Sequence, residues 1–306
     1  MRNSVESATH LTSSTVKGVA FTLISALAWG SSFPVIRWGV GFINPLVFLF
    51  FRFLTASLFT TPLIIKNIRA IRRLLGSRYI ILIGVLNAIG YLLEFTGLAY
   101  TTASKASLLV NLNAVFVALF AAFILGERLN KRRLLALTIG LTGALTVILN
   151  GDLSIIFSGS LTGDILVLAA GLIWALYIVY SKKVVEVEDS NSSADFFNLT
   201  WVNLILSTVI FTPFALTFMI ADSSFFTSIM TSEVFFSVAY LSLVCTVLAF
   251  LLYFKGLKYI SASSVAVILL SEILFAVLIS YIFLFEPVTL YLIIGGFLIT
   301  LAVLLS

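Results

Sequence analysis

Long apolar runs, separated by short polar segments, follow one another along the whole chain. Each run is about as long as the roughly 20 residues that a helix needs to cross a bilayer. The runs are too long for the alternating strands of a membrane barrel, so each predicts a helix. The chain is therefore predicted to be an all-α polytopic membrane protein. The ten transmembrane helices are predicted at 18–40, 45–65, 79–100, 104–125, 133–149, 163–181, 196–220, 234–257, 263–285 and 289–306.

Composition supports this prediction, since 61% of the residues are hydrophobic, only 10% are charged and the mean hydropathy is +1.17. A soluble fold needs more charge on its surface. The longest segments between the predicted spans have only about 12–15 residues, too few for a further folded domain.

Basic residues fall almost entirely on one side of the predicted membrane. If the N-terminus is cytoplasmic, fifteen Lys and Arg residues lie inside, whereas only Arg37 and Lys105 lie outside, where both can snorkel to the surface. Residues 1–15 then form a polar cytoplasmic tail without the pattern of a signal peptide. We expect both termini in the cytoplasm and the protein in the inner or plasma membrane. The positive charge sets topology, so no nucleic-acid partner is expected.

Two stretches of the chain are versions of each other. Residues 92–127 match residues 251–286 at a constant shift of 159, with twelve identities in 36 positions. A weaker echo at a shift of 145 pairs Trp29 with Trp174. The sequence therefore predicts two repeats, 16–149 and 163–306. Five spans in each repeat make the two inverted in the membrane, an arrangement typical of transporters with a site between the repeats.

The sequence offers few of the residues that enzyme catalysis commonly uses. The one histidine, His10, lies in the polar tail, and Cys245 is the one cysteine and lies inside the eighth span. No P-loop motif is present, so the chain has no nucleotide-driven motor of its own. We expect no enzyme activity, no metal and no cofactor, and expect a gradient or an ion to drive movement of a solute.

Ionisable residues inside the predicted spans are costly in lipid and therefore mark candidate sites. Arg52 and Glu94 lie at matching depths in the second and third spans, which allows an ion pair. The pair would either hold the two spans together or face a substrate.

Glu272 lies near the middle of the ninth span with no basic residue at its depth in the same repeat. Its counterpart under the shift of 159 is Asn113, so the two should meet near the symmetry axis, where a substrate would sit. Glu272 suits a proton-coupling site, a hydrogen-bond donor to substrate, or a protonated group bonded to a neighbouring helix. Asn111 is about 200° from Asn113 around a helix, so we expect only one of the two to face the cavity.

Two tryptophans also lie in mid-span. Trp29 and Trp174 each need an acceptor for the indole N–H, which favours a cavity lining over lipid, helix packing being the alternative. Tyr177 is one turn from Trp174 on the same face. Pro34 leaves the carbonyl of Gly30 without its helical donor, and the hydroxyl of Ser31 or Ser32 is expected to bond it.

The fifth span carries a stripe of small residues, Ala136, Gly140 and Ala144. Such a stripe favours close packing of helices. We expect it to serve either packing within the chain or a homodimer formed through the fifth and tenth spans.

Several of these segments together resemble the drug/metabolite transporter superfamily, in its ten-helix EamA-type branch. The matching segments are Trp29-Gly-Ser-Ser-Phe-Pro, Arg52-Phe-Leu, Tyr100-Thr-Thr-Ala-Ser-Lys-Ala-Ser, Leu125-Gly-Glu-Arg-Leu, Phe254-x-Gly-Leu-Lys-Tyr-x-Ser-Ala-Ser and Phe285-Glu-Pro-Val. The resemblance covers 16–306 and implies inverted repeats around a central cavity and export or uptake of amino acids, other small metabolites or drugs. The family often has a proline where Ala114 and Ile273 stand, so the fourth and ninth helices are expected to be straighter here.

The sequence thus predicts a secondary transporter that moves small metabolites, such as amino acids or related amphiphiles, by alternating access, with export favoured. A passive channel, a multidrug exporter and a non-transporting membrane assembly protein are the alternatives. The small-molecule substrate and membrane lipid are the expected partners.

Overall fold

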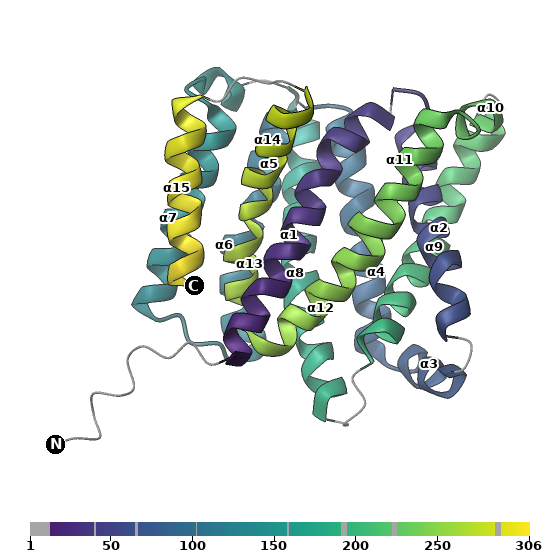
Figure 1. Ribbon diagram of the computed structural model, residues 1–306, viewed down its shortest axis with the longest axis horizontal. Helices are drawn as coiled ribbons and strands as arrows, with labels where there is room; N and C mark the ends of the chain where they lie inside the picture. Colours follow the sequence, from purple (N-terminus) through teal and green to yellow (C-terminus); the bar gives the residue numbers. More distant parts are fainter. Residues whose placement is uncertain are drawn as a thin grey trace.

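The computed structural model describes residues 13–39, 41–64, 67–101, 103–157, 159–190, 195–221, 225–284 and 289–306. All regular structure within these ranges is helical. Of the predicted polar tail at 1–15, residues 1–12 lie outside the described ranges. Long helices run side by side between the two ends of a bundle, with short connections at each end (Figure 1).

The first half of the chain runs back and forth between the two ends of the bundle. Its elements are α1 (Ser13–Gly39), α2 (Pro45–Ile64), α3 (Ile68–Leu75), α4 (Arg78–Leu98), α5 (Ala103–Asn111), α6 (Asn113–Phe120), the π-helix η2 (Ala121–Leu125), α7 (Lys131–Leu149) and the short 3₁₀ helix η3 (Leu153–Phe157).

The second half repeats this order in the opposite direction. Its elements are α8 (Leu161–Ser190), α9 (Phe196–Ala221), α10 (Phe225–Ile229), α11 (Ser232–Ser242), the π-helix η4 (Leu243–Leu248), α12 (Ala249–Tyr259), α13 (Ala262–Leu269), α14 (Ser271–Leu284) and α15 (Leu290–Leu305). In Figure 1, α1 rises from the lower end of the bundle, whereas its counterpart α8 descends from the upper end.

Over the described ranges, nine helical stretches are long and apolar enough to cross a membrane, and α15, with 16 residues, is a shorter apolar helix. Three of the nine are composite, because α5, α6 and η2 follow one another in one span, as do α11, η4 and α12, and α13 and α14. The prediction of an all-α polytopic membrane protein is confirmed.

The two halves pack into each other, so neither stands as a separate body. α1 contacts α12 and α14, α2 contacts α9, and α4 contacts α8 along its length. At Gly30 of α1 an added Cβ would lie 2.7 Å from the backbone oxygen of Glu272 in α14. Because glycine has no side chain, α1 can contact the backbone of α14 at Glu272, which is a candidate site residue.

The small residues of α7 pack within the same chain. Gly143 faces Gly295 of α15, where an added Cβ would lie 2.7 Å from the Gly295 carbonyl oxygen. Ala136 and Ala144 are buried, and a Cβ on Gly140 would meet Ala302 of α15. Close packing of small residues stabilises helix pairs in lipid. The stripe is used between α7 and α15, and a homodimer through the outer faces of these helices stays a prediction.

The fourth and ninth spans are interrupted in the middle, although neither has a proline there. At Leu112 and Leu270 the backbone changes to bonds three residues back, from Leu112 N–H to the Leu109 carbonyl and from Leu270 N–H to the Val267 carbonyl. A mid-helix 3₁₀ turn of this kind often marks a hinge. The expectation that these two helices are straighter than in other family members stays a prediction.

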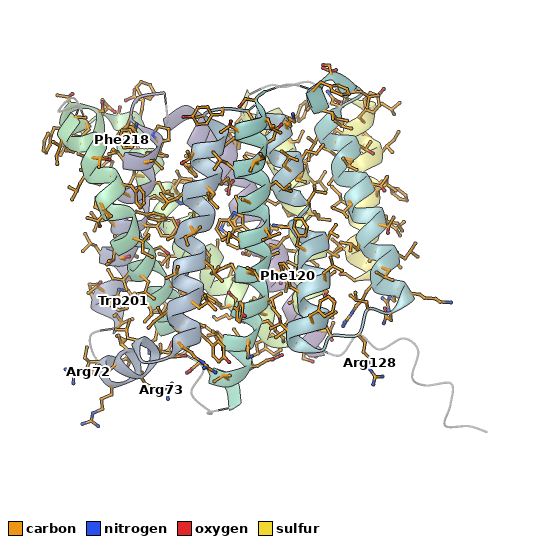
Figure 2. The ribbon with its side chains drawn as sticks, turned by 180° about the vertical axis from the view of Figure 1, so that it is seen from behind. Arg72, Arg73, Phe120, Arg128, Trp201 and Phe218 are labelled. Atoms are coloured by element: carbon orange, nitrogen blue, oxygen red, sulfur yellow. The ribbon has the colours of Figure 1, made fainter. Side chains whose placement is uncertain are left out.

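Basic side chains gather at one end of the bundle. Figure 2 shows Arg72, Arg73 and Arg128 at the lower end, from which α1 rises, and Phe218 at the upper end. At that upper end Lys105 pairs with Asp164 at 2.7 Å. The side chain of Arg37 lies outside the described residues.

Candidate functional site

A cavity of about 140 Å³ lies between the two halves. It has room for several water molecules, since one needs roughly 10–15 Å³. Its walls come from α1, α2, α4, α5, α6, α8, α12, α13 and α14. The lining residues lie in the second half of α1, the first half of α2 and the last third of α4. Since α1 and α4 ascend and α2 descends, the cavity occupies the middle and upper part of the bundle in Figure 1.

All nine residues that the sequence singled out line this one cavity. They are Trp29, Ser32, Arg52, Glu94, Asn111, Asn113, Trp174, Tyr177 and Glu272. Whether they bind a substrate stays a prediction, but they come from both repeats and from seven different helices.

Arg52 is held by the irregular part of α11–α12. Its Nε donates to the Thr246 hydroxyl at 2.7 Å, and its Nη2 donates to the Cys245 carbonyl at 2.9 Å. Both acceptors belong to η4, where the wider π turn brings a backbone carbonyl within reach of a side chain. The guanidinium also lies 5.6 Å from the centroid of the Tyr91 ring. Two of its five N–H groups are thereby used, and three remain.

The predicted ion pair between Arg52 and Glu94 is not formed. Both residues are described, and Glu94 accepts a hydrogen bond at 3.0 Å from the indole N–H of Trp174 in α8. Arg52 instead donates hydrogen bonds to two residues of η4. Matching depth in a sequence says nothing about rotation around each helix axis, and here rotation directs the two side chains to different helices.

Glu272 lies just after the interruption at Leu270, and Asn113 lies just after the one at Leu112. Glu272 has no side-chain hydrogen bond among the described residues, so its carboxyl oxygens stay available to a ligand. Asn111 donates to the Ser107 carbonyl of its own helix at 2.7 Å and still lines the cavity. The expectation that only one of Asn111 and Asn113 faces the cavity is wrong, because both line it.

The serines of α1 bond other carbonyls than the one predicted. The Ser31 hydroxyl donates to Ala28 at 2.7 Å, and the Ser32 hydroxyl donates to Trp29 at 2.6 Å, so neither reaches Gly30. A serine side chain on a helix reaches back three or four residues, which excludes the carbonyl of the residue one or two before it. The Ser31 oxygen also lies 2.7 Å from the Tyr240 hydroxyl of α11.

Aromatic rings form the lower wall of the cavity. Trp29 lies 5.4 Å from Phe250 and 5.6 Å from Tyr253 between ring centroids, and Tyr177 stacks on Tyr253 at 5.9 Å. Tyr177, Phe250 and Tyr253 are each at most 1% exposed. This cluster closes the cavity toward the end that carries the basic residues.

Sequence reasoning missed ten lining residues, but the internal repeat held a signal for several of them. These ten are Ile36, Tyr91, Phe95, Val110, Ile178, Phe250, Tyr253, Ala266, Leu269 and Leu270. The shift of 159 relates Tyr91 to Phe250 and Glu94 to Tyr253, as it relates Asn113 to Glu272. Equivalent positions of the two repeats thus line the cavity. Tyr253 could have been predicted from the sequence as the counterpart of Glu94 in the second repeat.

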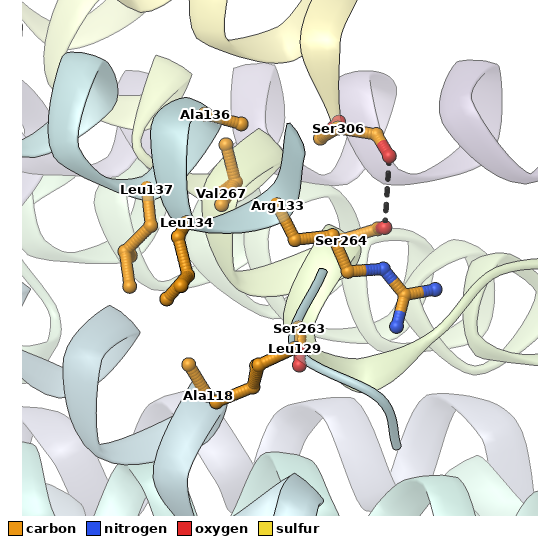
Figure 3. A pocket seen from close by; sticks show the side chains of 10 residues that line it. All are labelled: Ala118, Leu129, Arg133, Leu134, Ala136, Leu137, Ser263, Ser264, Val267 and Ser306. Atoms are coloured by element: carbon orange, nitrogen blue, oxygen red, sulfur yellow. Dashed lines mark hydrogen bonds between the residues drawn. The ribbon is translucent and has the colours of Figure 1, made fainter. Parts of the chain in front are cut away.

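Two further pockets in the described part of the chain are much smaller. The pocket in Figure 3, lined by Ser264, Ser306 and Arg133 among others, has only about 10 Å³. Ser264 donates there to the carbonyl of the last residue, Ser306. Among the described residues, no three His, Cys, Asp or Glu side chains lie close enough to hold a metal ion.

Comparison with known proteins agrees with this architecture. The EamA-like transporter family matches residues 16–149 and 161–306. The chain belongs to the EamA-like transporter family. It is accordingly a multi-pass membrane transporter of the drug/metabolite transporter type, as its resemblance implied.

Relatives in sequence agree with this assignment, and a solved structure shares the fold. An uncharacterized transporter of Archaeoglobus fulgidus is 31% identical, over 91% of this chain and 93% of its own length. A probable amino-acid metabolite efflux pump of Salmonella typhimurium is 25% identical over 54% of this chain and 53% of its own. A crystal structure with 16% identity covers 95% of this chain and 96% of its own, with a TM-score of 0.73, and shares the fold.

Proposed function

We propose that this chain is a secondary transporter that moves small metabolites by alternating access between its inverted repeats. The observation that carries the proposal is the cavity itself, which holds Arg52, Glu94 and Glu272 in the middle of an apolar bundle. Ionisable groups at this depth are costly and commonly mark a solute or ion pathway. Equivalent positions of the two repeats line the cavity, Glu94 with Tyr253 and Asn113 with Glu272, which fits a site that can be exposed to either side in turn.

Amino acids or related amphiphiles are the proposed substrates. The remaining N–H groups of Arg52 suit a carboxylate, and the free carboxyl of Glu272 suits an ammonium group. The rings of Trp29, Tyr91 and Trp174 offer an apolar wall for a side chain. Export is proposed because one distant relative is named an amino-acid metabolite efflux pump.

We place both termini in the cytoplasm and the protein in the cell membrane. With this orientation, the described state has its cavity in the outer half and its aromatic wall of Tyr177, Phe250 and Tyr253 toward the cytoplasm. Alternating access would require this wall to open toward the cytoplasm, and the turns at Leu112 and Leu270 would serve as hinges beside the cavity.

Counterflow in proteoliposomes tests the transport proposal. The purified protein is first screened by thermal shift against amino acids, nucleosides and cationic drugs, and the compound that raises the melting temperature most is used in radiolabelled form. Vesicles loaded with unlabelled compound should accumulate the label transiently above its outside concentration. A channel would equilibrate the label without overshoot, and an assembly protein would show neither uptake nor stabilisation by any compound.

A further inference from the structure

Two cations from distant parts of the chain meet at one tyrosine at the basic end of the bundle. Arg78 begins α4, and its Cζ lies 4.9 Å from the centroid of the Tyr79 ring. Lys183 lies near the end of α8, and its Nζ lies 4.8 Å from the same centroid. Arg78 Nη2 also donates to the Tyr79 hydroxyl at 3.2 Å. We call the group formed by Arg78, Tyr79 and Lys183 the cationic ledge.

The described carboxylates that closely follow Lys183 in the chain, those of Glu186, Glu188 and Asp195, have other partners. Glu188 pairs with Arg73 at 2.8 Å, and Glu186 lies 3.5 Å from Lys182. Asp195 accepts from the N–H groups of Phe197 and Asn198 at the start of α9. Among the described residues, neither Arg78 nor Lys183 forms an ion pair. Two like charges on one ring repel each other, and an anion between them would turn that repulsion into attraction.

The surroundings of the ledge suit a molecule that is partly in lipid. Tyr79 stacks on Tyr180 of α8 at 6.3 Å, and tyrosines of this kind are enriched at the level of the headgroups. The neighbouring α3 lies along the same end of the bundle (Figure 1). It buries Ile71 and Leu74 against the protein and leaves Ile68 about half exposed to the surroundings. Arg72 is also exposed on α3 and adds positive charge to the helix that carries Ile68.

We propose that Arg78, Tyr79 and Lys183 bind the phosphate group of an anionic phospholipid. The arginine fork and the tyrosine hydroxyl donate to phosphate oxygens, and the lysine adds a point charge. Free phosphate has the same chemistry, but acyl chains can also cover the exposed apolar surface of α3, which a free ion cannot do. Basic pockets between transmembrane helices on the cytoplasmic side commonly bind acidic headgroups. This proposal is independent of the transported substrate.

Binding of phosphatidylglycerol to the purified protein tests the proposal without any transport assay. Nanodiscs of phosphatidylcholine receive increasing fractions of phosphatidylglycerol, while thermal unfolding is followed and native mass spectrometry counts the retained anionic lipid. We compare the Arg78→Gln/Lys183→Gln double variant with an Arg128→Gln/Lys131→Gln control. The control removes two exposed positive charges around the start of α7, and Figure 2 shows Arg128 at the same lower end of the bundle, on the opposite side from Arg72 and Arg73.

The wild type and the control should gain stability with phosphatidylglycerol and retain one lipid, whereas the ledge variant should bind it about thirtyfold more weakly. This figure follows from about 1 kcal/mol for each basic residue near an anionic surface. Equal stability of all three proteins in pure phosphatidylcholine would show that the ledge variant is folded. Equal responses of both variants to phosphatidylglycerol, or protection by millimolar inorganic phosphate in detergent as strong as by the lipid, would overturn the proposal.

Discussion

The carboxylate of Glu127, in the loop after η2, accepts two hydrogen bonds from Ser263 in the first turn of α13. The Ser263 hydroxyl lies 2.7 Å and the Ser263 backbone nitrogen 3.3 Å from Glu127 Oε2. Glu127 also accepts from the backbone N–H of Ala262 at 2.7 Å. A residue of the first repeat therefore caps the helix that leads to Glu272 in the second repeat, with its negative charge at the positive end of that helix.

Replacing Glu127 by alanine should lower the free energy of unfolding by about 1–3 kcal/mol, because three partly buried donors lose their acceptor. Glu127→Gln keeps one oxygen acceptor and should lose less. Chemical unfolding in detergent measures the difference, with Glu186→Ala as the control, since Glu186 is half exposed. If the Glu127→Ala variant were as stable as the control, water would replace the carboxylate at no cost.

Glu94 and Trp174 should be energetically coupled, since they share a hydrogen bond at 3.0 Å inside the bundle. A double-mutant cycle with Glu94→Gln and Trp174→Phe should give a coupling of about 0.5–3 kcal/mol in thermal unfolding. The cycle of Glu94→Gln with Arg52→Gln should give a smaller value, because these side chains bond different helices. A larger coupling to Arg52 would indicate that the ion pair forms in another state of the protein.

Glu272→Gln should abolish transport driven by a pH gradient while leaving expression of the protein largely intact. Glutamine keeps the shape and a hydrogen bond but cannot release a proton. Uptake into proteoliposomes is measured between pH 5 and 8, with Asn113→Asp as a companion variant at the equivalent position. Wild-type rates for Glu272→Gln across this range would leave Glu272 as a hydrogen-bonding residue and would remove it from proton coupling.

Reporter fusions test the proposed orientation. A fusion after Arg73 should report a cytoplasmic position, and a fusion after Ile155, in the connection between α7 and α8, should report the outer side. The charge asymmetry of fifteen basic residues against two is the physical reason. An outside signal at residue 73 would reverse the whole arrangement, including the side on which the phospholipid site lies.

Gly143→Val should separate α7 from α15, because its added Cβ would lie 2.7 Å from the Gly295 carbonyl oxygen. Overpacking of this kind costs about 1–3 kcal/mol. Thermal unfolding should show the loss, and Thr142→Val, one residue away on the exposed face, should show little. Unchanged stability of both variants would indicate that α15 packs only loosely against α7.

The sequence by itself determined the class of this protein. Span length, the near absence of charge inside the spans and the excess of basic residues on one side depend only on local composition, because lipid imposes the same requirement on every helix. The repeat at a shift of 159 likewise related Asn113 to Glu272 without any coordinates. Those two residues do line one cavity, together with all the others that were chosen.

Only the tertiary structure decided which groups bond each other. Arg52 bonds the Thr246 hydroxyl and the Cys245 carbonyl of η4 and not Glu94, and no sequence pattern reveals these two acceptors. Asn111 and Asn113 both line the cavity, although their spacing on a regular helix predicts that only one of them does. Depth in the membrane follows from counting residues along a chain. The hydrogen-bond partner of a side chain depends on how its helix is rotated and on where the backbone departs from regular helix geometry. Packing between segments that are distant in the sequence determines both the rotation and these departures.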